Sequence, residues 1–569
     1  MAPAAVTIAN GATWQDVAAD RQRYRDATIA EVHPPVPELK SEDIPLNTTG
    51  IPKKLLTEEE IKITGTNVEE LVEKITSGEW TSTAVTKAFL RRAGLAQKLA
   101  NCITELLPKK ALERAAELDK YLADSKKPIG PLHGVPISVK EHMGFKGEDA
   151  NAGFVGWVGQ VPEEDSLILQ YLWDAGAVFY ARTTQPQTLM HLETSSNLYG
   201  ATVNPCNTTL TAGGSSGGEG ALIGLRGSIL GIGSDIGGSI RSPAANNGVF
   251  GYKPTTLRLP GDGWTVAMHG AESIIGTTGP LSTSLEGLRL FSKVLIDQQP
   301  WLKQPSLTAM NWKDSAEFFP DKKLRVGVMY NDDVVRPHPP ILRALTELVG
   351  KLKHSPDIEI VDWSPWKHDL AWSIIASLYF ADGGADVRAA IELSGEPWLP
   401  LSKFILVDNP RVKEHTITSL WEAVSAREEY RTKYAQLWNE TASSSPDARP
   451  IDVILCPAGP GVAPKLETSR YWGYTSQWNL LDYPAVVFPV ADKVDTLERE
   501  KPFEYPEDYV PLGEEDKYIY DLWKKHGTEG YKDAPISLQL VGRRNQDEQL
   551  LKATQILLEK AGLPAVVPS

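Results

Sequence analysis

One segment of the chain is much richer in glycine than the rest and also carries serines that could do chemistry. Residues 213–241 read GGSSGGEGALIGLRGSILGIGSDIGGSIR. Clustered glycines indicate backbone that adopts positive φ or comes close to another group. A serine hydroxyl is a poor nucleophile at neutral pH unless a base accepts its proton. The segment therefore needs a partner elsewhere in the chain if one of its serines is to react.

Two well-known glycine-rich motifs fit this segment poorly. A Walker phosphate loop ends in Gly-Lys-Ser/Thr, and a dinucleotide-binding turn needs a third glycine where this chain has Ile236. Residues 214–218 match the Gly-x-Ser-x-Gly elbow of α/β-hydrolases, with Ser216 in the nucleophile position. That elbow follows a buried strand, whereas the preceding residues TTLTAGG are polar. We therefore interpret Ser216 as a hydrogen-bond donor within the site and count it among the expected substrate-binding residues.

A lysine can supply the missing base if burial lowers its pKa. Lys140 directly follows the apolar run GVPISV at residues 134–139, whose neighbours would bury the lysine stem and disfavour its charge. Considered alone, a lysine at the end of a strand more often reaches solvent. The assignment of Lys140 as a base therefore depends on the motifs around it.

Those motifs resemble the amidase signature family. GVPISVKEH, GGSSGGEG and GSDIGGSIR follow one another in the family's order, with KPT at residues 253–255. The segment NPCN at residues 204–207 and the closing PISLQLVGRRNQDEQLL extend the resemblance over most of the chain. GEGALIG, PQTL and LDYPAVVFPV are similar to the branch that holds fungal acetamidases and fatty-acid-amide hydrolases.

The resemblance implies a Ser-Ser-Lys triad. The serine of GGSIR is Ser239, the expected acyl-ester nucleophile, and the first serine of GGSSGG is Ser215, the expected bridging serine after a cis peptide bond. Lys140 is the expected base. The implied reaction cleaves a carboxylic amide to an acid and ammonia or an amine, without a metal or cofactor. The alternatives are an esterase or acyl transferase that uses the same acyl-enzyme, and a non-catalytic binding protein on this fold.

Substrate-binding positions are expected beside the nucleophile and in one more distant segment. The backbone N–H groups of Ile236, Gly237, Gly238 and Ser239 can converge on a developing oxyanion, because small residues let the substrate carbonyl approach closely. Leu189 aligns with a pocket-lining position of the fatty-acid-amide branch, although core packing explains an apolar residue there equally well.

Other conspicuous side chains are interpreted as structural. Asp235 and Arg241 flank the nucleophile and are expected to form an ion pair that orients its loop. The ten histidines show no metal-binding spacing such as HExxH. Three of them are interpreted as packing or hydrogen-bonding residues: His133, His142 and His191. Six of the 16 tryptophans lie between residues 363 and 438, where burial in the core is favoured over a role in a substrate pocket.

Apolar runs of strand length alternate with amphipathic stretches, and they predict the elements that must position these residues. Strands are predicted at residues 134–139, 177–181, 228–232, 324–329, 358–361, 453–456, 485–489 and 536–541. Helices are predicted at residues 14–32, 68–77, 166–174, 340–352 and 546–561, and another is expected after Ser82. The alternation predicts an α/β protein, and the resemblance implies the amidase signature fold, a large mixed β-sheet core covered by helices on both faces.

The expected organisation is one large domain with an arm. Residues 1–65 are predicted to form an N-terminal helical arm and a proline-containing connector, and residues 66–569 a single amidase signature domain. The charged and proline-containing segment 493–532 is predicted to be a solvated surface loop.

Composition excludes several other classes of protein. The 569 residues include 58 Lys and Arg against 73 Asp and Glu, a net charge of −15 that argues against nucleic acid as a partner. Three cysteines without a CxxC pair argue against a disulfide framework and favour a reducing compartment. Neither a signal peptide nor a membrane span is evident, so the cytoplasm is the predicted location. The expected partners are a small-molecule amide and, in a homodimer, a second copy of the chain.

Overall fold

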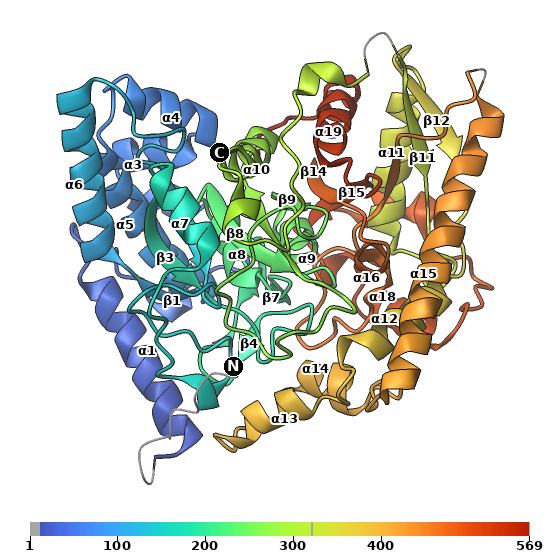
Figure 1. Ribbon diagram of the computed structural model, residues 1–569, viewed down its shortest axis with the longest axis horizontal. Coiled ribbons are helices and arrows are strands. Elements are labelled where there is room, and N and C mark those ends of the chain that lie inside the picture. The colour runs from blue at the N-terminus through green and yellow to red at the C-terminus, as the bar shows by residue number, and fades with distance from the viewer. Residues whose placement is uncertain (1–11, 320–321, 446, 568–569) are drawn as a thin grey trace.

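One large sheet runs through the computed structural model, which describes residues 12–319, 322–445 and 447–567 (Figure 1). Its eleven strands lie in the order β1-β3-β2-β8-β10-β9-β14-β15-β13-β11-β12. In that order they span Ile103–Leu106, Val178–Thr183, Pro136–Lys140, Leu230–Asp235, Thr277–Ser282, Phe250–Lys253, Ala485–Lys493, Pro535–Val541, Val453–Pro457, Leu324–Val328 and Ile358–Asp362. Strands β3, β2 and β8 are parallel, as are β13, β11 and β12, whereas the central pairs are antiparallel. The sheet is therefore mixed, as predicted.

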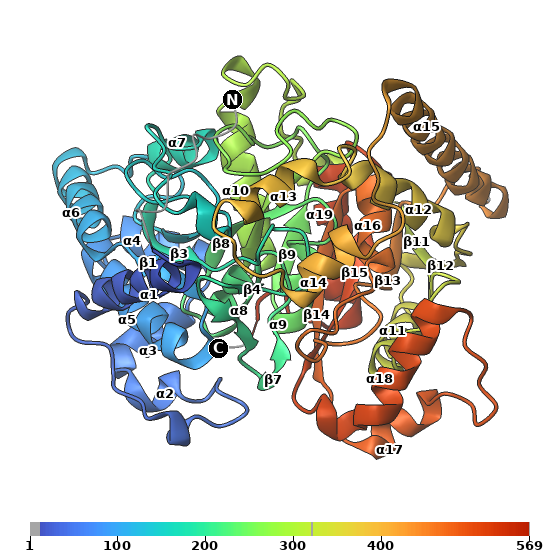
Figure 2. The ribbon, with the colours of Figure 1, turned by 90° about the horizontal axis from the view of Figure 1, so that it is seen from below.

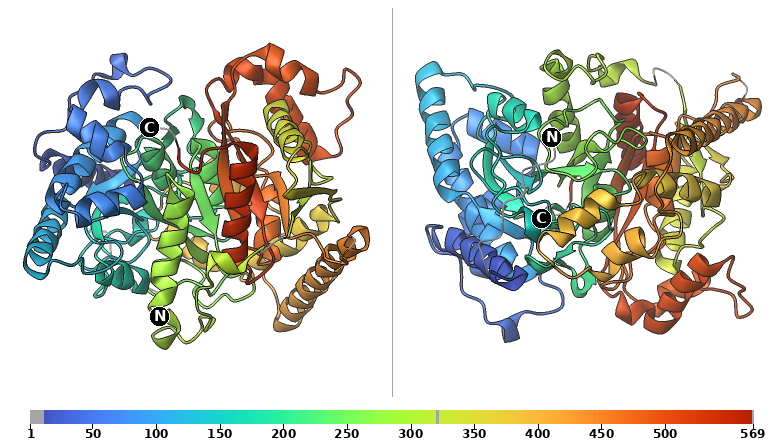
Figure 3. Two further views of the ribbon diagram at one scale, coloured as in Figure 1. Left: turned by 90° about the horizontal axis from the view of Figure 1, so that it is seen from above. Right: turned by 60° about the horizontal axis from the view of Figure 1, so that its bottom comes forward.

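Helices cover both faces of this sheet. Apart from α1 (Trp14–Ala30) and α18 (Glu514–Gly530), the helices of at least seven residues are α3 (Glu58–Gly65), α4 (Val68–Thr76), α5 (Ser82–Ala100), α6 (Pro108–Ser125), α7 (Leu167–Asp174), α8 (Gly217–Gly224), α9 (Arg241–Asn247), α10 (Leu285–Asp297), α11 (Pro339–Leu352), α12 (His368–Tyr379), α13 (Ala385–Glu392), α15 (Ile417–Glu440), α16 (Gly473–Leu480) and α19 (Asp547–Ala561) in the part of the chain that the structure describes. Figure 3 shows α10 and α19 side by side against the sheet, and Figure 2 shows α15 at the edge of the molecule.

The side chains of β8 differ in size between its two faces, so that α8 can approach one face closely while α10 covers the other. Successive side chains of a strand point to opposite faces. Gly231 and Gly233 share one face, where a Cβ at Gly231 would lie 1.9 Å from Glu219 of α8. Ile232 points to the opposite face and shares an apolar cluster with Phe291 of α10. Small residues on one face and large apolar ones on the other therefore place α8 unusually close to the strand.

The predicted strands and helices are present, with ends shifted by a few residues. Three strands of the large sheet were not predicted, namely β1, β9 and β10. They read ITEL, FGYK and TTGPLS, and each mixes polar residues, glycine or proline with few apolar ones. All three are fully buried, because β9 and β10 lie between other strands and helices α1 and α5 pack on the edge strand β1.

The N-terminal segment packs against the edge of the sheet. Helix α1 (Trp14–Ala30) begins with a capping box between Thr13 and Asp16 and contacts β1, where Arg21 lies 3.5 Å from Glu105. The connector contains a cis peptide bond before Pro34. The division of the chain at residue 65 stays a prediction.

The structure corrects the expectation for residues 493–532. This segment is not a plain surface loop, because it contains α17 (Leu497–Glu500) and the long helix α18 (Glu514–Gly530). Ile519 and Trp523, one helical turn apart, are buried. The charged residues on both sides of them obscure this helical spacing in the sequence.

The tryptophans between residues 363 and 438 are not all core residues, contrary to the prediction. Trp363 and Trp438 are buried, but Trp421 of α15 is 66% exposed. The other three are partly buried against the apolar cluster that contains Trp363 and Trp438: Trp366, Trp372 and Trp398.

Across the ranges that the structure describes, no helix combines the length and the apolar composition needed to cross a membrane.

Candidate active site

Lys140 lies at the carboxyl end of β2, at the edge of the sheet where parallel strands commonly form binding sites. Strands β3 and β8 flank it, and the residue is completely buried. Its Nζ lies 2.6 Å from Ser215 Oγ and 3.1 Å from Ser234 Oγ. Burial lowers the pKa of Lys140 to about 7, although nearby Asp235 and Glu219 favour its charged form. Much of Lys140 is therefore neutral near pH 7 and able to accept a proton.

Ser215 precedes α8 in a loop that only glycine allows to pass this close to its neighbours. The peptide bond between Gly214 and Ser215 is cis, as the sequence resemblance implies. A Cβ at Gly214 would lie 2.1 Å from the carbonyl oxygen of Glu193. The loop therefore packs directly on another backbone segment and holds the Ser215 hydroxyl against Lys140.

Ser239 lies in the turn that leads from β8 to α9. Its carbonyl oxygen accepts a hydrogen bond from the N–H of Ser216 at 3.0 Å, which ties this turn to the Ser215 loop. Ser215 and Ser239 line the same cavity. Within the described part of the chain no hydrogen bond joins their two hydroxyls. The structure thus brings all three expected residues together, with Lys140 in contact with Ser215.

The peptide groups before Ser239 are held in fixed directions. The carbonyl oxygen of Ile236 accepts a hydrogen bond from the Tyr379 hydroxyl at 2.8 Å, and that of Gly237 accepts one from Thr475 Oγ1 at 2.6 Å. Because a trans peptide points its C=O and the following N–H in opposite directions, the N–H of Gly237 points away from Tyr379. The hydroxyls of Tyr379 and Thr475, which belong to other elements, therefore fix the orientation of the peptide groups in this turn.

One N–H group that was expected in the oxyanion hole is already used. Gly238 N–H donates to Asp235 Oδ1 at 2.9 Å, so it is not free to bind an oxyanion. In the described ranges, no partner accepts the N–H groups of Ile236, Gly237 or Ser239. Gly238 is needed for another reason, because its φ is +131° and a Cβ there would lie 2.4 Å from Thr475 Oγ1.

Asp235 and Arg241 form the ion pair expected from the sequence. Arg241 Nη2 lies 3.0 Å from Asp235 Oδ1, and both side chains are fully buried. Asp235 also accepts the N–H of Ile240 at 3.1 Å. Burial alone would raise the pKa of Asp235, but the charge and hydrogen bonds of Arg241 hold it well below its usual range. The carboxylate therefore stays ionised and maintains the shape of the turn.

The cavity beside Ser239 has a volume of about 220 Å³ and a mostly apolar wall. Apart from the serines, its lining includes Leu189, Met190, Ile274, Leu378 and Tyr379. A second chamber of about 600 Å³ shares residues of the loop 266–271 with it. Asp382 and Asp386 line this second chamber, the outer chamber, but do not line the cavity beside Ser239. Leu189 therefore lies in the cavity wall, where an apolar part of a substrate would contact it.

Ser216 lies behind the cavity and is absent from its described lining. Its Oγ lies 3.5 Å from the carbonyl oxygen of Ser234 and 3.4 Å from the Ser234 nitrogen. Its own N–H donates to Ser239, as described above. Ser216 thus contacts the backbone of β8 and of the turn at Ser239, and it does not line the cavity as the expected substrate-binding residue would.

The three histidines singled out in the sequence differ in their surroundings. His133 Nδ1 accepts the N–H of Ile129 at 3.2 Å. His191 is buried, and neither of its ring nitrogens has a partner among the described residues. His142 lines the cavity, and its Nε2 lies 2.9 Å from Ser234 Oγ.

Three residues of the site were not assigned from the sequence. Ser234 lies inside the GSDIGG motif, where its position next to Asp235 could have indicated a role. Tyr379 and Thr475 belong to α12 and α16, about 140 and 235 residues beyond the turn that they hold, and no local motif marks them.

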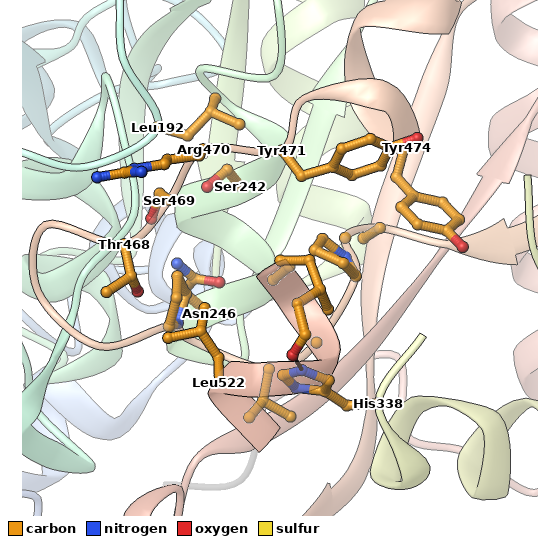
Figure 4. Close-up of a pocket in the computed structure, with 18 of the residues that line it drawn as sticks. Leu192, Ser242, Asn246, His338, Thr468, Ser469, Arg470, Tyr471, Tyr474 and Leu522 are labelled. Carbon is orange, nitrogen blue, oxygen red and sulfur yellow. Dashed lines mark hydrogen bonds between the residues drawn. The ribbon is translucent and has the colours of Figure 1, made fainter. Parts of the chain in front are cut away.

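A smaller cavity borders α9 and contains none of the three expected catalytic residues (Figure 4). Its volume is about 60 Å³, and Ser242, Asn246, His338 and Tyr471 contribute to its lining. His338 Nε2 donates to the carbonyl oxygen of Ile519 at 2.9 Å. Because this lining holds no serine paired with a base, the larger cavity beside Ser239 is the candidate site for amide chemistry.

Comparisons with known proteins show which family this chain resembles. The Amidase family model matches residues 84–551. A relative from Schizosaccharomyces pombe is 47% identical over 95% of this chain and 98% of its own length. An acetamidase of Emericella nidulans is 39% identical over 95% of this chain and 96% of its own. A solved structure of a fatty acid amide hydrolase has a TM-score of 0.89 and 34% identity, covering 97% of this chain and 96% of that chain.

Proposed function

The chain belongs to the amidase signature family and is an amidase, and from that premise we propose that it forms an acyl-enzyme on Ser239, with Ser215 as the bridging serine and Lys140 as the base. The observation that carries the proposal is the 2.6 Å contact between Lys140 Nζ and Ser215 Oγ in a fully buried setting. Burial that lowers the pKa of Lys140 to about 7 makes this lysine a suitable base at neutral pH.

In the proposed reaction, protons move along the triad while Ser239 attacks. Neutral Lys140 accepts the proton of Ser215, and Ser215 accepts that of Ser239 as its oxygen bonds to the amide carbon. The same path then returns a proton to the leaving nitrogen, the C–N bond breaks, and water repeats the sequence to release the acid. Transfer between the two serines requires their hydroxyls to approach when substrate binds, as catalytic hydrogen bonds often do.

The oxyanion of this reaction would be stabilised by backbone N–H groups of the turn before Ser239. Among the described residues, nothing accepts the N–H groups of Gly237 and Ser239, and the hydrogen bonds from Tyr379 and Thr475 hold the turn in place. Such preorganised donors each contribute about 3 to 4 kcal/mol to transition-state stabilisation. The proposal keeps Gly237 and Ser239 from the expected donors and removes Gly238, whose N–H binds Asp235.

The proposed substrate is a carboxylic amide with an apolar acyl group. The cavity beside Ser239, here the inner cavity, has a volume of about 220 Å³. This volume greatly exceeds the roughly 10 to 15 Å³ that is needed to hold one water molecule. It therefore has room for an acyl group larger than acetyl, against Leu189, Met190 and Ile274. The outer chamber would receive the amine part, because it continues from the inner cavity past the loop 266–271.

The test combines a substrate screen with active-site labelling. Primary amides of increasing acyl length would be compared with their anilides and methyl esters, using Ser239→Ala as the blank. A fluorophosphonate should add one adduct to the wild-type chain and none to Ser239→Ala, as measured by intact mass. An adduct that persists in Ser239→Ala, or wild-type amide turnover in Lys140→Ala, would contradict the proposed roles.

A further inference from the structure

A buried histidine lies beside the site and has no role in the reaction proposed so far. His142 is 1% exposed, and its Nε2 lies 2.9 Å from Ser234 Oγ. Ser234 Oγ in turn lies 3.1 Å from Lys140 Nζ, which contacts Ser215 Oγ at 2.6 Å. The four side chains therefore form one continuous series from His142 through Ser234 and Lys140 to Ser215.

Hydrogen bonds hold the backbone of His142, and an aromatic contact holds its ring. Its backbone N–H donates to Gln185 Oε1 at 3.1 Å, and its carbonyl oxygen accepts the N–H of Thr265 at 2.8 Å. The ring of Trp264 packs edge-on against it, with 5.5 Å between the ring centroids. Burial, together with the positive charge of nearby Lys140, lowers the pKa of His142 well below its ordinary value. The ring is therefore neutral at the pH where the enzyme would work.

The number of hydrogens on each group determines which group donates in the contacts between Lys140, Ser234 and His142. A neutral lysine has two N–H groups and one lone pair. If that lone pair is to accept the proton of Ser215, Lys140 must donate a hydrogen to Ser234 and not accept one from it. Ser234 has a single hydrogen, which then needs a different acceptor. His142 Nε2 lies at the right distance to accept it when the neutral ring carries its proton on Nδ1.

We infer that His142 is a positioning residue: its Nε2 accepts the hydrogen of Ser234, Ser234 accepts a hydrogen from Lys140, and the lysine lone pair is left facing Ser215. This inference rests on the proposed function, because only a lysine that acts as the base needs its lone pair directed. Without the acceptor, the Ser234 hydroxyl can turn and donate to Lys140, where it competes with Ser215. His142 itself gains and loses no proton in the reaction.

The test is a double-mutant cycle between His142 and Ser234. His142→Phe keeps a ring but removes the acceptor, and it should lower kcat and the rate of fluorophosphonate labelling about tenfold, with little change in KM. His142→Gln should restore most of the loss, because its Oε1 can accept the same hydrogen. In the Ser234→Ala background, His142→Phe should have no further effect. His191→Phe makes the same change at a buried histidine whose ring has no hydrogen-bond partner among the described residues, and it should leave labelling unchanged.

Each outcome decides a different point. If the effects of His142→Phe and Ser234→Ala multiply in the double variant, His142 acts by a route other than Ser234 and the inference is wrong. Wild-type labelling in His142→Phe also overturns it. If His142→Phe does not fold, His142→Leu replaces it in the cycle. Wild-type labelling in Lys140→Ala would instead refute the proposed function itself, whereas loss of labelling there with a multiplicative cycle refutes only the role of His142.

Discussion

Raising the pH from 5 to 10 should accelerate the labelling of Ser239 by a fluorophosphonate, with half of the maximal rate reached near pH 7. The reason is that burial lowers the pKa of Lys140 to about 7, and only its neutral form can accept a proton. At pH 8 a lysine with that pKa is about 90% neutral, whereas an ordinary lysine is less than about 1% neutral. The rate should rise about tenfold per unit below pH 6 and become constant by about pH 8.5.

The assay is the pseudo-first-order rate of adduct formation by intact mass, which reports activation of the nucleophile without the departure of an amine. Two buried carboxyl groups also titrate in this range, because burial raises the pKa of Glu141 to about 7 and that of Glu219 to about 8. Glu141→Gln and Glu219→Gln should therefore retain the rise with pH, and Lys140→Ala should lose labelling. A rate that still increases above pH 9, or a rise that disappears in either glutamine variant, would refute the reasoning.

Three further predictions concern the turn and its surroundings. Tyr379→Phe removes the hydroxyl that holds the Ile236 carbonyl and should lower kcat about tenfold; an unchanged kcat would show that the turn needs no such support. Gly238→Ala should lower amide turnover at least about a hundredfold, because its φ is +131° and Thr475 leaves no room; wild-type turnover would contradict this. Glu219 has a folded-state pKa raised to about 8, above its unfolded value, so its contribution to stability is full at low pH and lost as pH rises to about 8. Calorimetry should therefore show the wild-type melting temperature falling relative to Glu219→Gln between pH 5 and pH 9, and parallel curves would argue against the raised pKa.

Much of the fold could be predicted because its strands carry their own signal. The runs that became β2, β3 and β15 are apolar and of strand length, so burial and β-propensity agree. Strands β9 and β10 could not be predicted, because their burial comes from neighbours in the sheet. Helix α18 was missed because its buried positions Ile519 and Trp523 are flanked by charged residues, which favour a surface loop.

The candidate site was predicted in part. The motifs indicated Lys140, Ser215 and Ser239, and the structure places all three together. They could not indicate which N–H groups of the turn are free, because the use of Gly238 N–H by Asp235 depends on how the turn closes. Nor could they indicate that Ser216 lies outside the cavity.

By itself, the sequence determined the positions of most of the strands, the identity of the side chains that could react, and the glycines that let loops approach closely. These properties depend on residue type and local spacing, which the sequence contains. Only the tertiary structure decided that Lys140 is completely buried, that His142 lies within hydrogen-bond distance of Ser234, and that Thr475 holds the turn before Ser239. Desolvation and hydrogen-bond direction are set by groups that become neighbours only when the sheet assembles, and Thr475 is 236 residues beyond Ser239.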